Sequence, residues 1–177
     1  ESMISAFKSL LGEHNVLTGE QLASRYVHIW RMNDGLTAKA LLLPESTEEV
    51  SEIMKICTAH NQPVVVHGGL TNLVGSTETT LQEVVISMER MRTIEELDTS
   101  SRTVTAQAGV ILENVQKLAE ENDLLFPMNF GAKGSAQIGG IISTNAGGMR
   151  VVRYGMTRNL VLGLEVVLAD GTIISSL

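Results

Sequence analysis

PMNFGAKGSAQIGGIISTNAGGMRVVRYG, residues 127–155, holds seven of the 16 glycines in this chain. The residues between the glycines are small and polar, as at Ser135, Ser143 and Thr144. Glycine loses much backbone entropy on folding, so this density indicates sharp turns or a backbone that lies against a flat or anionic ligand. A loop that is glycine-rich only for tight packing is the alternative that the stretch alone leaves open.

A second concentration of glycines, HGGLTNLVGS at residues 67–76, directly follows the apolar run 64–66. Open α/β sheets bind ligands at the carboxyl ends of their strands, and backbone amides freed by glycine can hold an anion. The stretch is neither a Walker A loop nor a Gly-x-Gly-x-x-Gly dinucleotide motif, so a phosphate contact and a plain turn both stay open. We call residues 67–76 the first glycine-rich segment and residues 127–155 the second.

Composition limits the classes of protein that the chain can represent. The 177 residues are 44% hydrophobic and 19% charged, which is typical of a globular protein. A net charge of −7 without any Lys/Arg cluster argues against binding to nucleic acid. No apolar run reaches the ~20 residues that a membrane span needs. The single cysteine, Cys57, is typical of a reducing compartment, and we expect a cytoplasmic protein.

The first half of the chain reads as a strand–helix–strand unit. A helical pattern at 3–11 is followed by an apolar strand at 38–43, a helix at about 46–60 and a short strand at 64–66. Ser46 and Glu49 have the spacing of a capping box at the start of the second helix. This order predicts two parallel strands joined by a right-handed crossover, with the strand 64–66 buried on both faces. Cys57 falls on the apolar helix face and is expected in the core.

The second half reads as shorter strands and helices around the second glycine-rich segment. The first half ends with an expected strand at 83–88. After it we expect a strand at 103–108, a helix at 110–122, a helical turn at 137–144 and a long apolar strand at 159–169, closed by a hairpin turn at Asp170-Gly171. The predicted class is α+β with two lobes. Residues 1–90 form a βαβ lobe with a small parallel sheet, and residues 91–177 form a lobe with a mainly antiparallel sheet and helices.

The histidines give no support for a hydrolase or a metal enzyme. His14, His28, His60 and His67 share no spacing typical of metal ligands, and no Ser/His/Asp arrangement can be defended from their order. Only His67 stands at an expected ligand loop. It is either a residue that nearby phosphate would hold in its charged form or simply the last residue of a strand. We assign no catalytic residue and no metal ligand.

The two glycine-rich segments, PVVVHGGLTNLVGS and residues 127–155, together with the strand VLGLEVVLADG behind them, resemble a known domain. They are similar to the FAD-binding domain of the vanillyl-alcohol oxidase / p-cresol methylhydroxylase superfamily. Within that superfamily the chain most resembles the FAD-linked D-2-hydroxyacid dehydrogenases, which include the D-lactate and D-2-hydroxyglutarate dehydrogenases. The similarity covers residues 38–177.

The resemblance implies FAD as the cofactor, held by three sets of residues. The first set wraps the pyrophosphate, the second lies along the cofactor, and the third lies beside the flavin and in the turn after it. The sets are His67, Gly68, Gly69, Leu70, Thr71, Asn72, Leu73 and Gly75; then Gly131, Gly134, Ser135, Gly139 and Gly140; then Thr144, Asn145, Gly147, Gly148, Tyr154 and Gly155.

Two positions of the first set depart from the family pattern. Where this chain has Leu70 the family usually has Gly or Asn, and where it has Asn72 the family has Gly. Asn tolerates a left-handed backbone, so the change at Asn72 is mild. Some relatives carry, in place of Leu70, a histidine that bonds covalently to the flavin. Leucine cannot form that bond, so non-covalent FAD is expected.

The resemblance further implies the FAD-binding portion of an enzyme that oxidises a D-2-hydroxy acid, such as D-lactate, D-2-hydroxyglutarate or glycolate, to the 2-oxo acid and passes electrons to an acceptor. In the family a separate cap domain supplies the substrate-binding groups, so we expect this portion alone to be inactive. A related alcohol oxidase or ether-lipid synthase is the alternative. A nucleotide-binding or structural module without a redox role is a third reading.

Overall fold

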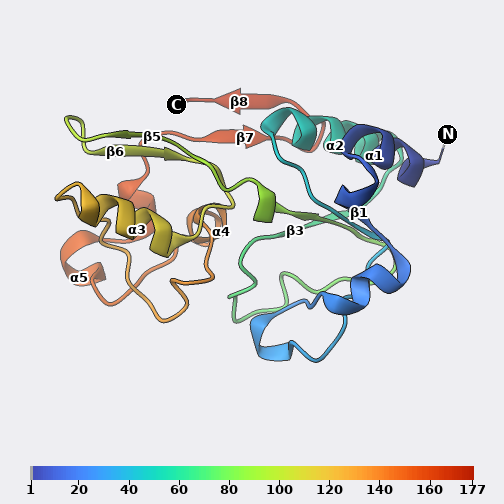
Figure 1. Ribbon diagram of the computed structural model, residues 1–177, viewed down its shortest axis with the longest axis horizontal. Coiled ribbons are helices and arrows are strands. Elements are labelled where there is room, and N and C mark those ends of the chain that lie inside the picture. The colour runs from blue at the N-terminus through green and yellow to red at the C-terminus, as the bar shows by residue number, and fades with distance from the viewer. Residues whose placement is uncertain (1) are drawn as a thin grey trace.

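The computed structural model describes residues 2–177 as a small central sheet, two antiparallel hairpins and five short α-helices (Figure 1). The helices are α1 (Met3–Leu11), α2 (Thr47–Ala59), α3 (Leu112–Glu121), α4 (Ile138–Ser143) and α5 (Val151–Tyr154). The strands are β1 (Val16–Leu17), β2 (Ala40–Leu42), β3 (Val64–His67), β4 (Val84–Ser87), β5 (Ile94–Asp98), β6 (Thr103–Ala106), β7 (Glu165–Val167) and β8 (Ile173–Ser175). The predicted α+β class is confirmed. Within residues 2–177 no helix has the length and apolar character of a membrane span.

The central sheet has the strand order β1-β2-β4-β3, with β2, β4 and β3 parallel and β1 antiparallel to β2. The predicted parallel pairing of the βαβ unit is therefore correct in direction, but β4 lies between its two strands. This corrects the expectation that 64–66 is buried on both faces. β3 is the edge strand, and 56% of Val66 is exposed, whereas all four residues of β4 are buried. Local apolarity alone does not distinguish the two strands.

Helix α2 covers one face of this sheet beside α1 (Figure 1). Its N-terminus is capped as the sequence predicts, because the Ser46 hydroxyl accepts a hydrogen bond from the Glu49 backbone N–H at 3.1 Å. Ile53 and Cys57 point from α2 into a core that also contains Phe7. Burial raises the pKa of the Cys57 thiol to about 11, so it stays protonated and is a plain core residue, as expected.

The chain after residue 90 contains a separate group of buried side chains. β5 and β6 form an antiparallel hairpin, and α3 buries Leu112, which packs with Met128 and Ile141. The sequence indicates β6 and α3 but gives no element for the charged stretch 91–98. Its residues 94–98 form β5, whose backbone pairs with β6 while none of its five side chains is fully buried.

The predicted long strand at 159–169 is wrong. Residues 157–160 form a 3₁₀ turn, and β7 contains only three residues. Before β7 the backbone passes close to the end of the chain at Gly163, where a Cβ would lie 2.4 Å from the Ser176 carbonyl oxygen. The turn at Gly171 is confirmed, with φ of +85°. The turn packs onto α2, because the Ser51 hydroxyl donates a 2.5 Å hydrogen bond to the Gly171 carbonyl.

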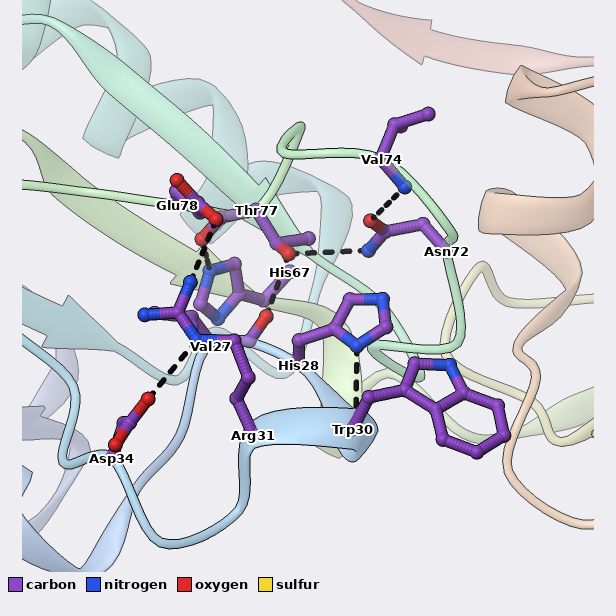
Figure 2. A network of polar contacts seen from close by, with 10 residues as sticks. All are labelled: Val27, His28, Trp30, Arg31, Asp34, His67, Asn72, Val74, Thr77 and Glu78. Atoms are coloured by element: carbon purple, nitrogen blue, oxygen red, sulfur yellow. Dashed lines mark hydrogen bonds and ion pairs between the residues drawn. The ribbon is translucent and has the colours of Figure 1, made fainter.

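Thr77, which directly follows the first glycine-rich segment, holds that segment to the fold (Figure 2). Its buried hydroxyl donates to the Val27 carbonyl at 2.6 Å and accepts from Asn72 Nδ2 at 3.1 Å. Its own carbonyl oxygen accepts from His67 Nε2 at 2.9 Å. Asn72 Oδ1 in turn accepts from the Val74 backbone N–H at 3.3 Å. One threonine thus joins both ends of the segment to the chain around residue 27.

His67, at the end of β3, contributes to this network as a neutral ring. Only 2% of the residue is exposed, and burial lowers the pKa of its imidazole, which the hydrogen bond to Thr77 opposes only in part. Because the partner is a carbonyl oxygen, Nε2 carries the proton in the assigned tautomer. His67 therefore acts as a structural tie and is not a preformed cation.

The hydrogen bonds of the Thr77 hydroxyl should contribute more to the free energy of unfolding than an exposed hydrogen bond of the same kind. Thr77→Val leaves a buried Val27 carbonyl and the Asn72 amide without their partner, so the free energy of unfolding should fall by about 1–3 kcal/mol. Thr79→Val is the matched control, since the Thr79 hydroxyl donates to the Thr37 carbonyl at 2.6 Å where water can replace it. Urea unfolding measures both, and equal losses would contradict the assignment.

The lowered pKa of His67 predicts a loss of stability in mild acid. Between pH 7.5 and 5.5 the unfolded chain takes up a proton at this histidine, whereas burial in the folded chain resists the same proton. The free energy of unfolding should therefore fall as the pH falls through about 6.5, the ordinary histidine value. His67→Gln should flatten that dependence in urea titrations at a series of pH values. An unchanged slope would show that other groups cause it.

Candidate functional site

The two glycine-rich segments, which lie 50 residues or more apart in sequence, touch through their backbones. A Cβ on Gly69 would lie 2.0 Å from the Ser135 carbonyl oxygen and 3.0 Å from the Ala136 Cα. Only glycine allows this approach, because any side chain would collide with rigid backbone rather than with a movable group. The structure therefore brings the predicted first and second sets together, although no local pattern specifies the contact.

A cavity of about 270 Å³ opens at this junction. The predicted site residues that line it are His67, Gly68, Gly69, Leu70, Gly134 and Ser135. Ligand pockets usually measure about 300–1,000 Å³, so a cavity of this size holds only part of a large cofactor. The remaining predicted residues of the three sets do not line the cavity and would have to contact other parts of a ligand.

Sequence reasoning missed the polar wall of the cavity, which includes Arg25, Glu89 and Gln137. The Arg25 guanidinium donates to both oxygens of Glu89, at 2.8 and 3.0 Å. Burial alone would raise the pKa of Glu89, but the hydrogen bonds and charge of Arg25, with smaller contributions from Ser87 and Arg90, together lower it. The two residues are 64 positions apart, so no sequence spacing points to this pair.

The first glycine-rich segment is strained at Leu70. This residue has φ of +57°, in the left-handed region that bulky side chains rarely adopt. Its carbonyl oxygen accepts a hydrogen bond from the Ile29 backbone N–H at 3.1 Å, which helps to hold the conformation. Asn72, where we expected a left-handed residue to be tolerated, has no positive φ. The Asn72 side chain instead accepts a hydrogen bond within the turn. Of the two departures from the family pattern, only the one at Leu70 therefore places a side chain on a left-handed backbone.

Six of the seven glycines of the second segment fall into two groups. Gly134 belongs to neither, since a Cβ there would make an ordinary contact, 3.7 Å from Glu113 Oε2. A Cβ on Gly139, Gly147, Gly148 or Gly155 would lie within 3.0 Å of another group of the protein, such as the Asn129 carbonyl for Gly148. A Cβ on Gly131 or Gly140 would meet nothing within 4 Å, and neither residue has a positive φ. Packing therefore explains the first group, and the fold gives no reason for glycine at the other two positions.

The third predicted set lies beyond the cavity and is tied into turns. Asn145 has φ of +49°, and its Oδ1 accepts from the Arg158 backbone N–H at 3.0 Å, which ties it to a residue 13 positions later in the chain. The Thr144 hydroxyl donates to the Gly140 carbonyl at 3.0 Å. The Arg153 guanidinium lies 5.2 Å from the centre of the Tyr154 ring. A cofactor role for this set stays a prediction.

Comparisons with known proteins identify a family and several relatives of this chain. The FAD_binding_4 family, described as "FAD binding domain", matches residues 38–176. A "Probable D-2-hydroxyglutarate dehydrogenase, mitochondrial" of Oryza sativa subsp. indica is 44% identical over 98% of this chain and 31% of its own length. A "D-2-hydroxyglutarate dehydrogenase, mitochondrial" of Danio rerio is 41% identical over 98% of this chain and 32% of its own. The chain thus spans about a third of the length of these relatives.

The same relatives correct one expectation. Both are named mitochondrial, so the cytoplasmic location that we expected from the single cysteine is contradicted. A reduced, buried thiol such as Cys57 is compatible with more than one compartment, because burial rather than the surrounding redox state keeps it unreactive.

A solved structure supports the fold independently. The structure "alkyldihydroxyacetonephosphate synthase in P212121" superposes with a TM-score of 0.87 over 98% of this chain and 34% of that one, at 17% identity. At that identity the likeness shows the fold alone. Together with the family match over residues 38–176, it leads to one conclusion. The chain belongs to the family of FAD binding domains.

Proposed function

We propose that this chain is the FAD-binding portion of a flavin-dependent oxidoreductase that oxidises a D-2-hydroxy acid, with D-2-hydroxyglutarate as the first candidate, to the 2-oxo acid. The observation that carries the proposal is the meeting of the two glycine-rich segments at Gly69 and Ser135, around one cavity. The 44% and 41% identity to proteins named D-2-hydroxyglutarate dehydrogenase supports the choice of substrate class. The proposed enzyme also requires an acceptor to which it passes the electrons.

The residues present fit FAD. Gly131 and Gly140 keep open the space that a Cβ would fill, and the fold itself does not need glycine at either position. Backbone amides and small polar side chains suit a pyrophosphate and a planar ring that must approach closely. Leu70 offers no atom for a covalent bond to the flavin, which supports non-covalent binding. The site residues named from the sequence remain our assignment for this cradle.

When bound, FAD supplies two-electron oxidation of a carbon that carries a hydroxyl group. The residues of this chain bind and orient the cofactor. Thr77 fixes the loop that would lie along it, and Gly69 keeps the two halves of the cradle in contact. His67 is already bonded to the Thr77 carbonyl, so we do not assign it the removal of the substrate's hydroxyl proton. We assign that proton transfer to a part of the proposed enzyme outside this chain.

We also propose the division into two lobes near residue 90. It is supported by the buried clusters, because two of them contain only residues up to Ile86 and the third begins at Leu112. The alternative function, a related alcohol oxidase or ether-lipid synthase, has weaker support. The synthase is similar in fold at 17% identity, whereas identity to the named dehydrogenases is above 40%.

Titration of the purified chain with FAD, followed by flavin absorbance and by heat, tests the proposal. We expect saturable binding of one FAD, and no oxidation of D-2-hydroxyglutarate by the 177-residue chain alone. A longer protein, in which this chain is joined to a segment equivalent to the rest of the relatives, should oxidise D-2-hydroxyglutarate. Preference for another nucleotide would contradict FAD binding. Oxidation of an unrelated alcohol instead of the D-2-hydroxy acid would favour the alternative.

A substitution at Gly140 tests whether glycine is required at this position by a bound ligand or by packing within the protein. Gly140→Ala should raise the free energy of unfolding without ligand by about 0.5–1 kcal/mol, because alanine is favoured inside a helix and the new Cβ meets nothing within 4 Å. The same change should weaken FAD binding, since the methyl group occupies space meant for the cofactor. Calorimetry and urea unfolding measure the two effects.

Gly69→Ala is the contrasting control for this pair of measurements. Its Cβ would collide with the Ser135 carbonyl, so it should lower both stability and affinity. A Gly140→Ala protein that keeps wild-type FAD affinity would remove Gly140 from the cradle.

A further inference from the structure

Gln137 carries the least explained polar side chain in the described part of the protein. The residue is 8% exposed, and its Oε1 is buried and accepts no hydrogen bond from residues 2–177. Asn15 Oδ1 is in the same state, but the amide nitrogen of Asn15 donates to the Leu11 carbonyl. Native proteins rarely bury a polar atom without a partner, so Gln137 calls for an explanation.

The backbone of Gln137 is fixed at the junction of the two glycine-rich segments. It pairs with Ile111 in an isolated β-bridge, and its carbonyl oxygen accepts from the Ile141 backbone N–H at 3.1 Å. Its side chain lies against Gly68, where a Cβ would be 3.6 Å from Oε1, and lines the cavity. The terminal torsion of glutamine is soft, so the amide can turn toward a bound group at little cost.

The charges around the cavity argue against a phosphate at this point. Arg25, the cation on the cavity wall, is already held by both oxygens of Glu89. The Ser87 hydroxyl also donates to this carboxylate, at 3.0 Å. The positive charge is therefore neutralised by a partner within the protein. Phosphate oxygens act only as hydrogen-bond acceptors, so a phosphate here would bind the Gln137 amide nitrogen alone and would leave Oε1 without a donor.

We propose that Gln137 binds an uncharged part of FAD that carries a hydrogen-bond donor, and that the pyrophosphate lies elsewhere along the two segments. This inference rests on the proposed FAD-binding function. A hydroxyl or N–H group satisfies Oε1, and a carboxamide can also donate to the same group in return. Such groups occur in both halves of FAD, as the adenine amino group and ribose hydroxyls or as the ribityl hydroxyls and the flavin N–H.

Gln137→Leu tests this assignment through affinity and the melting temperature of the ligand-free chain. Leucine removes the amide at similar volume. The dissociation constant for FAD should rise about tenfold, the effect of one good hydrogen bond. The melting temperature without ligand should stay the same or rise by a few degrees, because an unpartnered buried oxygen is removed. A lowered melting temperature would show a structural role and overturn the proposal, as would an unchanged FAD affinity.

Gln62→Leu is the matched control. Gln62 Nε2 donates to the Pro63 carbonyl at 2.8 Å and to the Gln82 carbonyl at 2.6 Å, before the start of β3 and away from the cavity. Its replacement should lower the melting temperature and leave the dissociation constant for FAD unchanged. If the wild-type chain binds no FAD at all, both this inference and the proposed function fail. If the wild type binds and Gln137→Leu binds equally well, this inference fails alone.

Partial ligands identify the half of FAD that Gln137 contacts. A selective loss of ADP affinity in Gln137→Leu assigns the contact to the adenosine half, and a selective loss of FMN affinity assigns it to the flavin half. Competition by inorganic pyrophosphate should be unaffected by the substitution. If only the pyrophosphate affinity falls, the contact is with phosphate and the proposal is wrong.

Discussion

The architecture depends on close backbone contacts that only glycine permits. At Gly69 the first glycine-rich segment touches the Ser135 carbonyl of the second, and a Cβ there would lie 2.0 Å from that oxygen. Gly109 makes a similar approach to the carbonyls of Met88 and Met91, and Gly139 to Ala108. The first two of these contacts join the ends of β3 and β4 to residues that follow the central sheet. The cavity lies at the most important of them, because both of its glycine-rich walls are positioned by the same contact.

Two further ties keep these elements in place. Thr77 holds the first segment from behind, through buried hydrogen bonds to Val27 and from Asn72 (Figure 2). At the other end of the chain, the β7–β8 turn packs on α2, where the Thr58 hydroxyl donates to the Ala169 carbonyl at 2.5 Å. The turn brings residues from the end of the chain onto a helix from its first third (Figure 1). The first glycine-rich segment and the β7–β8 turn are therefore both held by polar contacts between residues distant in sequence.

Local patterns predicted the elements that short-range chemistry decides. The cap at Ser46, the apolar repeat of α2 and the turn at Gly171 all depend on neighbouring residues, and all three were found. Local patterns could not predict the strand order, because β3 and β4 are both apolar in sequence. Only the fold shows that β4 lies in the centre of the sheet and β3 at its edge. The glycine-rich segments were recognisable, but the Arg25–Glu89 pair joins residues too far apart for any spacing to reveal. The long strand expected at 159–169 was not found, because its apolar composition does not reveal that residues 157–160 form a 3₁₀ turn and that only three residues of the rest pair with β8.

Three departures from good local structure lie in the two glycine-rich segments. Leu70 is the one bulky aliphatic residue with a left-handed backbone in residues 2–177, Gln137 buries an oxygen without a partner, and Gly140 sits inside a helix where nothing excludes a side chain. Each costs on the order of 1 kcal/mol. Sequences that fold well agree with their structure at every level, except where function requires otherwise. Three independent kinds of local cost within two adjoining segments are difficult to explain by packing. A bound cofactor that satisfies the amide and fills the open space explains Gln137 and Gly140 together, and the strain at Leu70 is what a loop preorganised for that cofactor would retain.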